Sequence, residues 1–187
     1  MRDFALAAHE FCQITFLLTS LPALSEVAAP AETGASFEEN ALLKARYYSA
    51  FSEELVVADD SGLEVEALGG APGVLSARFA GTGATDAENN ALLLQRMRGI
   101  CNRDARFVCV LALARAGKEI ATFRGEVQGL VLDEGRGKAG FGYDPLFFMP
   151  AFGKSFGELA GADKLRVSHR GEALRHLFGY LSGIEKR

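Results

Sequence analysis

The sequence predicts an α/β fold from three observations. The apolar stretch 55–58 (LVVA) has the length and composition of a buried strand. Residues 106–114 and 119–132 flank a short glycine-containing turn and predict a β-hairpin. Capping-box patterns near residues 36 and 85, a Ser or Thr followed three positions later by Glu, each predict the start of a helix. Strands and helices mixed along one chain are typical of the α/β class.

The first predicted helix begins at Ser36, whose oxygen can accept a hydrogen bond from an amide of the first turn while Glu39 reaches back. We expect this helix to run to about Phe51. Lys44 lies on the same face as apolar residues. It is either a lysine whose stem covers the edge of the core, with its charge in water, or a ligand contact.

Two further helices are predicted. The capping box Thr85–Glu88 begins a helix that carries Leu92, Leu93 and Met97, and Ser168 begins an amphipathic helix to Leu181. Between them, residues 134–142 form a glycine-rich loop, followed by an apolar and extended stretch, 145–149.

Composition limits the partners of the chain. Its 187 residues are enough for one sizeable domain or two lobes. A net charge of −4 gives no basic surface for nucleic acid. Three cysteines without a C-x-x-C spacing argue against disulfides or zinc and favour the cytosol. The apolar segment Phe11–Leu24 lacks a basic flank and is too short to span a bilayer, so we expect a core helix or strand there and no membrane partner.

The run Asp59–Leu63 (DDSGL) places two carboxylates directly after the strand 55–58. Neighbouring strand residues point to opposite faces, so one carboxylate can face a ligand while the scaffold holds the other. Two acids at such a position need a cation, and a metal ion carrying phosphate oxygens would supply it. The alternative is a polar turn in which Ser61 and Gly62 make a bend.

A second group of residues suggests a nucleobase site. Phe141–Asp144 combines aromatic rings with a carboxylate, which can stack on a purine and accept a ring N–H. A core aromatic beside a turn-capping Asp explains the same pattern. Arg170 lies in the first turn of the last helix, where the helix dipole disfavours a cation, and Lys164 lies shortly upstream. Such a broken local rule is often found at a site.

Two phosphate-binding patterns are rejected. Residues 135–140 match G-x-G-x-x-G but lead into an extended run rather than a helix. Gly153–Ser155 resembles the end of a Walker A loop, but Phe148 occupies the position of the required earlier glycine.

Together the motifs resemble one family, the inosine/xanthosine triphosphate pyrophosphatases, which hydrolyse non-standard purine nucleoside triphosphates. Several motifs in one order are far more specific than any one alone. The resemblance covers about Glu32 to Leu181. The matching segments are Glu32–Gly34, Phe37–Ala41, Lys44–Arg46, Ala58–Leu63, Leu68–Gly73, Ser76–Arg78, Gly140–Pro145 and Ser168–Gly171.

The resemblance implies an elongated, mixed and twisted sheet flanked by helices, with two lobes and a central cleft. It implies a homodimer that uses Mg²⁺ and releases a monophosphate and pyrophosphate, and the cysteine usage places this homodimer in the cytoplasm. The family begins with a strand and a Thr/Ser-x-Asn-x-x-Lys loop, whereas Met1–Phe4 resembles the helix after that loop. We therefore expect one pyrophosphatase domain over residues 1–187, short at its N-terminus and weaker in triphosphate affinity.

The resemblance also implies roles by position. Asp60 is the implied general base and a metal ligand, with Glu32 as the second metal ligand. Lys44 is the implied phosphate contact and Ser61 a substrate contact. The residues implied to bind the purine are Phe141, Gly142, Tyr143, Asp144, Lys164, His169 and Arg170.

These roles agree with the chemistry of the groups. Arg170 donating to a 6-oxo group and Asp144 accepting from the ring N–H would select hypoxanthine or xanthine over adenine, whose edge reverses both partners. Three alternatives remain at this stage. They are a catalytically impaired purine nucleotide-binding protein, a Maf-like pyrophosphatase for modified or pyrimidine nucleotides, and a partner-binding module whose polar residues only cap turns.

Overall fold

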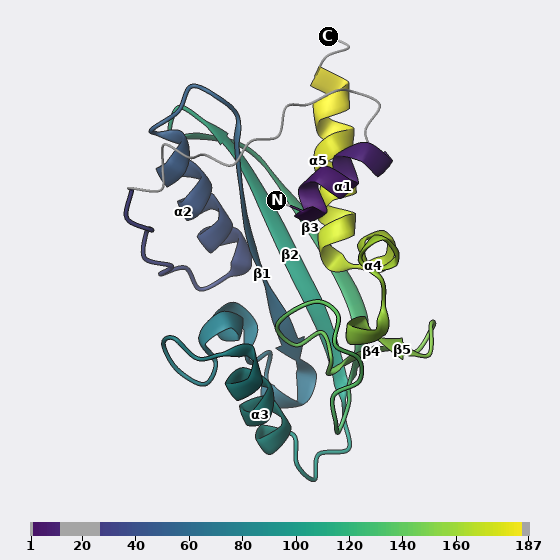
Figure 1. Cartoon of the computed structure of the whole chain (residues 1–187). Coiled ribbons are helices and arrows are strands. Elements are labelled where there is room, and N and C mark those ends of the chain that lie inside the picture. Colours follow the sequence, from purple (N-terminus) through teal and green to yellow (C-terminus); the bar gives the residue numbers. More distant parts are fainter. Residues whose placement is uncertain (1, 12–26, 185–187) are drawn as a thin grey trace. The chain divides into compact units, whose positions relative to one another are not determined.

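The computed structural model describes residues 2–11 and 27–184 (Figure 1). It confirms the predicted α/β fold, with helices and strands mixed along the chain. The helices are α1 (Arg2–Phe11), α2 (Phe37–Ser49), α3 (Asp86–Arg96), α4 (Gly161–Val167) and α5 (His169–Ile184). The strands are β1 (Val56–Val65), β2 (Asp104–Arg115), β3 (Lys118–Val131), β4 (Phe147–Met149) and β5 (Lys154–Ser155). Short 3-10 helices are η2 (Glu66–Leu68), η3 (Gly73–Arg78) and η4 (Phe156–Glu158).

The described strands form one sheet in the order β1-β2-β3-β4-β5. The predicted hairpin is confirmed by β2 and β3, which are joined at Ala116 and Gly117, both with positive φ. Pairs of this kind match the twist of the flanking strands, which is why two-residue hairpin turns favour them. Strands β3, β4 and β5 pair in antiparallel fashion, with Leu130 opposite Phe148 and Met149 opposite Lys154.

The chain divides into two compact units, and β1, β2 and β3 each contribute residues to both. The first unit comprises Met1–Asp60, Cys109–Gly125 and His169–Arg187. The second comprises Ser61–Val108 and Glu126–Ser168. The expectation of a single domain stays a prediction.

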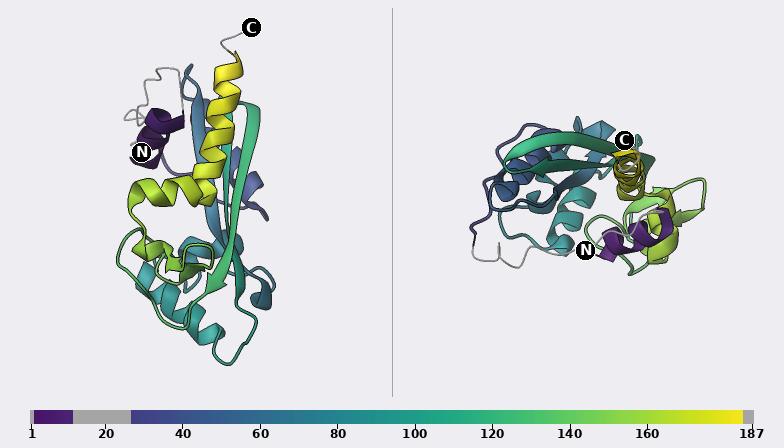
Figure 2. Two further views of the ribbon diagram at one scale, coloured as in Figure 1. Left: turned by 90° about the vertical axis from the view of Figure 1, so that its right-hand side faces the viewer. Right: turned by 90° about the horizontal axis from the view of Figure 1, so that it is seen from above.

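In the first unit, α1 lies against α5, as both orientations show (Figures 1 and 2). Many of the buried apolar residues come from β2, α2 and α5, and they include Ala41, Ala45, Leu111, Leu174 and Leu177. Gly125 of β3 allows close approach to the start of α5, because a Cβ there would lie 2.2 Å from the carbonyl oxygen of His169.

The second unit has its own core, built around aromatic rings. Phe107 and Phe156 stack with ring centroids 5.8 Å apart, and the Phe147 ring centroid lies 4.6 Å from that of Phe107. Leu93 of α3 and Met97, the residue that caps its C-terminus, are fully buried in the same core. The predicted apolar face of this helix therefore packs against the core of the second unit.

Helix α2 begins where predicted, but its capping box differs by one residue. Ser36 Oγ accepts from Glu39 N at 3.2 Å, as expected. The Glu39 carboxylate instead accepts from Ala35 N at 2.7 Å, one residue before the cap. The helix also ends at Ser49 rather than near Phe51. By contrast, the box at Thr85 has both of its hydrogen bonds.

The polar turn considered for Asp59–Leu63 is not formed, since β1 continues through it from Val56 to Val65. Pairing with β2 satisfies the backbone groups that a turn would leave to water, and Leu63 and Val65 reach the core of the second unit. The turn preference of Ser61 and Gly62 is outweighed by these contacts.

Three other expectations can be compared with the structure. The stretch 145–149 is extended only over Phe147–Met149, because residues before it form a turn. Residues 135–140 do not open a helix, in agreement with the rejection of a dinucleotide motif. The apolar segment Phe11–Leu24 lies outside the described residues apart from Phe11, the last residue of α1. Among the described residues, none of the helices has the length and apolar character needed to cross a membrane.

Candidate active site

One cluster of predicted site residues lies in the first unit, where Lys44 joins two carboxylates. Its Nζ donates to Asp60 Oδ1 at 2.7 Å and to Glu32 Oε1 at 3.0 Å. Helix α2 carries the lysine, β1 carries Asp60, and Glu32 lies in the segment that leads into α2. The structure shows a lysine directed at carboxylates rather than one extended into water, and contact of Lys44 with a ligand stays a prediction.

Asn40 completes this cluster, although it was not among the site residues predicted from the sequence. It is fully buried, and its Nδ2 donates to Asp60 Oδ2 at 3.4 Å. Its Oδ1 accepts from Gly34 N at 2.8 Å, which ties the segment carrying Glu32 to α2. The available signal was its position one turn before Lys44, since residues four apart share a helix face.

Burial makes Asp60 a stronger base than an ordinary aspartate. Desolvation raises its pKa, and the hydrogen bond and charge of Lys44 offset this only in part. Burial also opposes the charge on Lys44, but its hydrogen bonds to Asp60 and Glu32 outweigh this and raise the pKa of the ammonium. The cluster thus holds a charged lysine beside a carboxylate with an increased proton affinity.

The neighbouring carboxylate, Asp59, belongs to a different contact. Arg170 of α5 donates to Asp59 Oδ2 at 2.7 Å and lies 3.6 Å from Asp3 of α1. Burial disfavours the guanidinium charge, but the charge of Asp59, its hydrogen bond and the charge of Asp3 are among the effects that together outweigh burial and raise the pKa of Arg170. The helix dipole disfavours a cation in the first turn of α5, and these carboxylates compensate for it. The unusual position of Arg170 is therefore explained by an ion pair in this unit. His169, the residue before it, is buried.

A second cluster lies in the second unit, in the segment 141–144, hereafter the base loop. Asp144 is buried, and its Oδ2 accepts from Phe141 N at 2.8 Å and from Lys164 Nζ. Gly140 permits this arrangement, since its φ is +79° and a Cβ would lie 1.8 Å from Asp144 Oδ2. Ser61 also belongs to this unit, within β1.

The two aromatic residues of the base loop lie in different environments, one exposed and one buried. Phe141 has 59% of its surface exposed, and Lys164 Nζ lies 5.0 Å from its ring centroid. Tyr143 is buried, and its hydroxyl donates to Ser76 O at 2.9 Å. Burial raises the pKa of Tyr143. Phe141 can therefore stack on a ligand, whereas Tyr143 supports the loop from the core.

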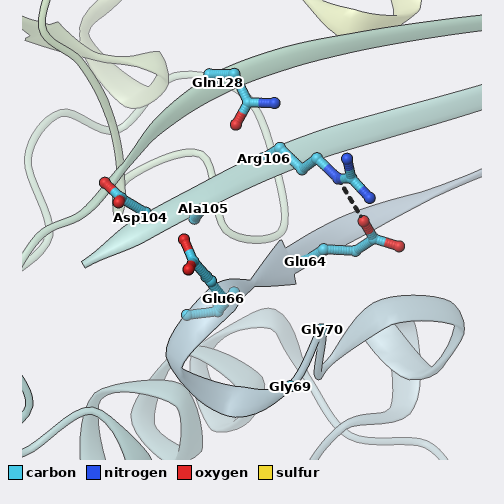
Figure 3. A pocket seen from close by; sticks show the side chains of 9 residues that line it. Glu64, Glu66, Gly69, Gly70, Asp104, Ala105, Arg106 and Gln128 are labelled. Carbon is cyan, nitrogen blue, oxygen red and sulfur yellow. Dashed lines mark hydrogen bonds and ion pairs between the residues drawn. The ribbon is translucent and has the colours of Figure 1, made fainter. Parts of the chain in front are cut away.

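A cavity of about 420 Å³ lies elsewhere in the second unit (Figure 3). None of the predicted site residues lines it. Arg106 donates to Glu64 at 2.6 Å across one side of it, and Glu66 and Asp104 lie nearby. A cluster of carboxylates such as Glu64, Glu66 and Asp104 does not by itself identify a ligand site.

Comparison with known proteins shows the family to which the chain belongs. The model of the Ham1 family matches residues 4–180, so the chain belongs to this family. A protein of Acidobacterium capsulatum named dITP/XTP pyrophosphatase is 50% identical over 193 residues, covering 98% of this chain and 93% of its own length. A protein of Thermus thermophilus with the same name is 53% identical over 150 residues, covering 79% of this chain and 72% of its own length.

Solved structures agree with this assignment. The structure of a Ham1 protein from Coxiella burnetii superposes with a TM-score of 0.88 at 36% identity, covering 97% of this chain and 94% of that protein. The Ham1 protein of Staphylococcus aureus gives a TM-score of 0.86 at 37% identity, covering 97% of this chain and 92% of that one.

Proposed function

We propose that this protein hydrolyses non-standard purine nucleoside triphosphates, dITP, XTP and ITP, to the monophosphate and pyrophosphate. The names of the relatives support this substrate class, and the chain matches nearly the whole length of one of them. The observation that carries the chemistry is Asp60, held by Lys44 and Asn40 with a raised pKa.

In the proposed reaction, Asp60 removes a proton from an attacking water. A bond forms between the water oxygen and the α-phosphorus, the bond from that phosphorus to the bridging oxygen breaks, and pyrophosphate leaves. The position of Asp60 favours this role, because its carboxylate is held by Asn40 and lies 2.7 Å from Lys44 Nζ, the proposed phosphate contact. Lys44 supplies a positive charge beside the base for the phosphate oxygens.

Mg²⁺ is part of the proposal. Among the described residues, no group of three or more His, Cys, Asp or Glu side chains is placed to hold a metal. Glu32 and Asp60 nevertheless direct oxygens at one cation, the ammonium of Lys44. Two carboxylates fit Mg²⁺, which usually takes one or two from the protein and completes its shell with water and phosphate. When bound, the ion would neutralise phosphate charge.

The base loop is proposed to recognise the purine. Phe141 offers an exposed ring for stacking, and Asp144 offers a buried acceptor that is paired with Lys164. Hypoxanthine and xanthine present a ring N–H to such an acceptor, whereas the corresponding nitrogen of adenine has no hydrogen. Contacts of His169 and Arg170 with the base stay predictions.

The substrate class is tested by pyrophosphate release in the presence of Mg²⁺. We expect dITP, XTP and ITP to be hydrolysed with kcat/KM at least about a hundred times that for ATP, because the adenine edge sets a ring nitrogen without a hydrogen against the Asp144 carboxylate. Equal values for all nucleotides would contradict the proposed selectivity. Faster hydrolysis of pyrimidine nucleotides would instead favour a Maf-like activity.

The role of Asp60 is tested by Asp60→Asn. This variant keeps the shape of the side chain but removes the base, and kcat should fall by at least about a hundredfold. Asp104→Asn, at an exposed carboxylate at the start of β2, is the matched control and should retain full activity. If Asp60→Asn hydrolyses dITP at the wild-type rate, Asp60 is not the base. If the wild-type protein binds inosine monophosphate but releases no pyrophosphate, it is a nucleotide-binding protein.

A homodimer in the cytoplasm completes the proposal. It is supported by the resemblance of the motifs to a family of dimeric enzymes. Light scattering coupled to size-exclusion chromatography tests the dimer directly, and a mass near the 20.0 kDa of a single chain would contradict it.

A further inference from the structure

The Gly142 peptide at the centre of the base loop is held from both sides by one helix. Asp86 Oδ2 accepts from Gly142 N at 2.6 Å. Asn90 Nδ2 donates to Gly142 O at 2.9 Å. Asp86 and Asn90 are four residues apart, so they share one face of α3 and reach the same peptide. We call this pair of contacts the α3 clamp.

Helix α3 is a firm support for such a clamp. Its N-terminus has a complete capping box at Thr85. Asn89 is buried, accepts from Ala80 N at 2.8 Å and donates to Ala77 O at 3.2 Å. Leu93 is fully buried in the core of the same unit. A helix fixed along its length can transmit a precise position to the loop that it holds.

The clamped residue sets the positions of its neighbours in the base loop. Gly142 has a φ of +60°, in the left-handed region, and nothing lies within 4 Å of the place where a Cβ would be. A loop at a glycine of this kind can take up many backbone conformations unless it is held. Phe141 precedes it and Asp144 follows two residues later, so the clamp holds the backbone between the stacking ring and the acceptor.

The clamp also leaves a polar atom without a partner. Asn90 Oδ1 is buried and has no hydrogen bond within the described structure. Donation to Gly142 O determines this orientation of the amide, and the cost is an unsatisfied acceptor.

We propose that Asp86 and Asn90 are positioning residues for nucleobase recognition, acting through Gly142 on Phe141 and Asp144. This inference rests on the proposed function of the base loop. Recognition of the base is binding that the ground state and the transition state share. Loosening the clamp should therefore raise KM and leave kcat unchanged.

The variants Asp86→Ala and Asn90→Leu each remove one side of the clamp, and each should raise the KM for dITP about tenfold. Asp86→Asn keeps an acceptor oxygen and should recover most of the lost affinity. Asn90→Asp keeps the size of the side chain but sets a carboxylate against the carbonyl of Gly142, so it should raise KM more than Asn90→Leu. Gln95→Ala, at an exposed position on the same helix, is the matched control.

The experiment measures kcat and KM for dITP together with Tm for every variant. A raised KM at unchanged kcat and Tm, with recovery in Asp86→Asn, supports the clamp. An unchanged KM overturns it. A parallel fall in kcat and Tm also overturns it, because the contacts would then only maintain the fold. If the wild-type enzyme fails to hydrolyse dITP, the proposed function is wrong. If the wild-type enzyme is active but the variants have the same KM, only the proposed role of the clamp is wrong.

Discussion

Lys44 is the residue on which the charge balance of the first cluster depends. It lies within hydrogen-bond distance of both Asp60 and Glu32, and only 17% of its side-chain surface is exposed. Without the ammonium, the two carboxylates would repel each other in a partly buried position, where such repulsion is poorly screened.

We therefore predict that Lys44→Met lowers the free energy of unfolding by about 2 kcal/mol, because it leaves two carboxylates without their cation. The variant should also gain more thermal stability from added Mg²⁺ than the wild-type protein does, since the ion can replace the missing charge. Urea titrations with and without Mg²⁺ measure both effects. Lys118→Met, at an exposed lysine in the same unit, is the control, and an equal Mg²⁺ effect in all three proteins would contradict the proposed metal ligands.

Part of the candidate site was accessible from single residues and their spacing. The carboxylates after the strand and the lysine on an apolar helix face stood out because such groups need a partner, but the roles of Asp60 and Lys44 came from the family resemblance. The ion pair between Asp59 and Arg170 was not accessible, because it joins positions 111 residues apart. The separate environments of Phe141 and Tyr143 depend on packing against other segments, which local sequence does not encode.

At the scale of elements, the capping boxes were the most reliable signals. They fixed the starts of α2 and α3, because a side-chain oxygen followed by a glutamate satisfies amides that no other local structure satisfies as well. Helix α4 was not predicted, and it has no side-chain cap. Strand β1 was predicted too short, because the local preferences of Ser61 and Gly62 do not reveal the pairing with β2.

The start of α3 gives a prediction at this scale. Thr85 Oγ1 accepts from Glu88 N at 3.2 Å, so Thr85→Ala should destabilise the protein by about 1 kcal/mol. Hydrogen exchange should show the largest increase at the first amides of α3, which lose their acceptor. Thr82→Ala, at an exposed loop position nearby, serves as the control. An equal loss of stability in both variants would show that the cap contributes nothing specific.

For the whole molecule, the chain path couples the two compact units. Neither unit is a continuous stretch, since the first is made of three segments and the second of two. The strands β1, β2 and β3 each enter both units, so unfolding either unit removes pairing from strands that the other needs. Independent unfolding should be disfavoured for this reason.

We predict one cooperative transition in urea, with coincident curves from far-UV circular dichroism and from tyrosine fluorescence, the latter being usable because the chain contains no tryptophan. Two separated transitions would show that the units unfold independently. A peptide of residues 61–108 provides the control. It contains only part of the second unit and should remain unfolded by both measurements.

The alternation along β1 restricts how this part of the chain can change in length. Asp59 is bound from α5 and Asp60 from α2, and successive strand side chains point in opposite directions. Losing or gaining one residue between Val56 and Asp59 would move each of the two aspartates to the opposite face of the sheet. The carboxylate that now contacts Lys44 would then point toward Arg170. The strand should therefore tolerate insertions or deletions here only of an even number of residues. Functional variants of this strand should contain no length change of an odd number of residues.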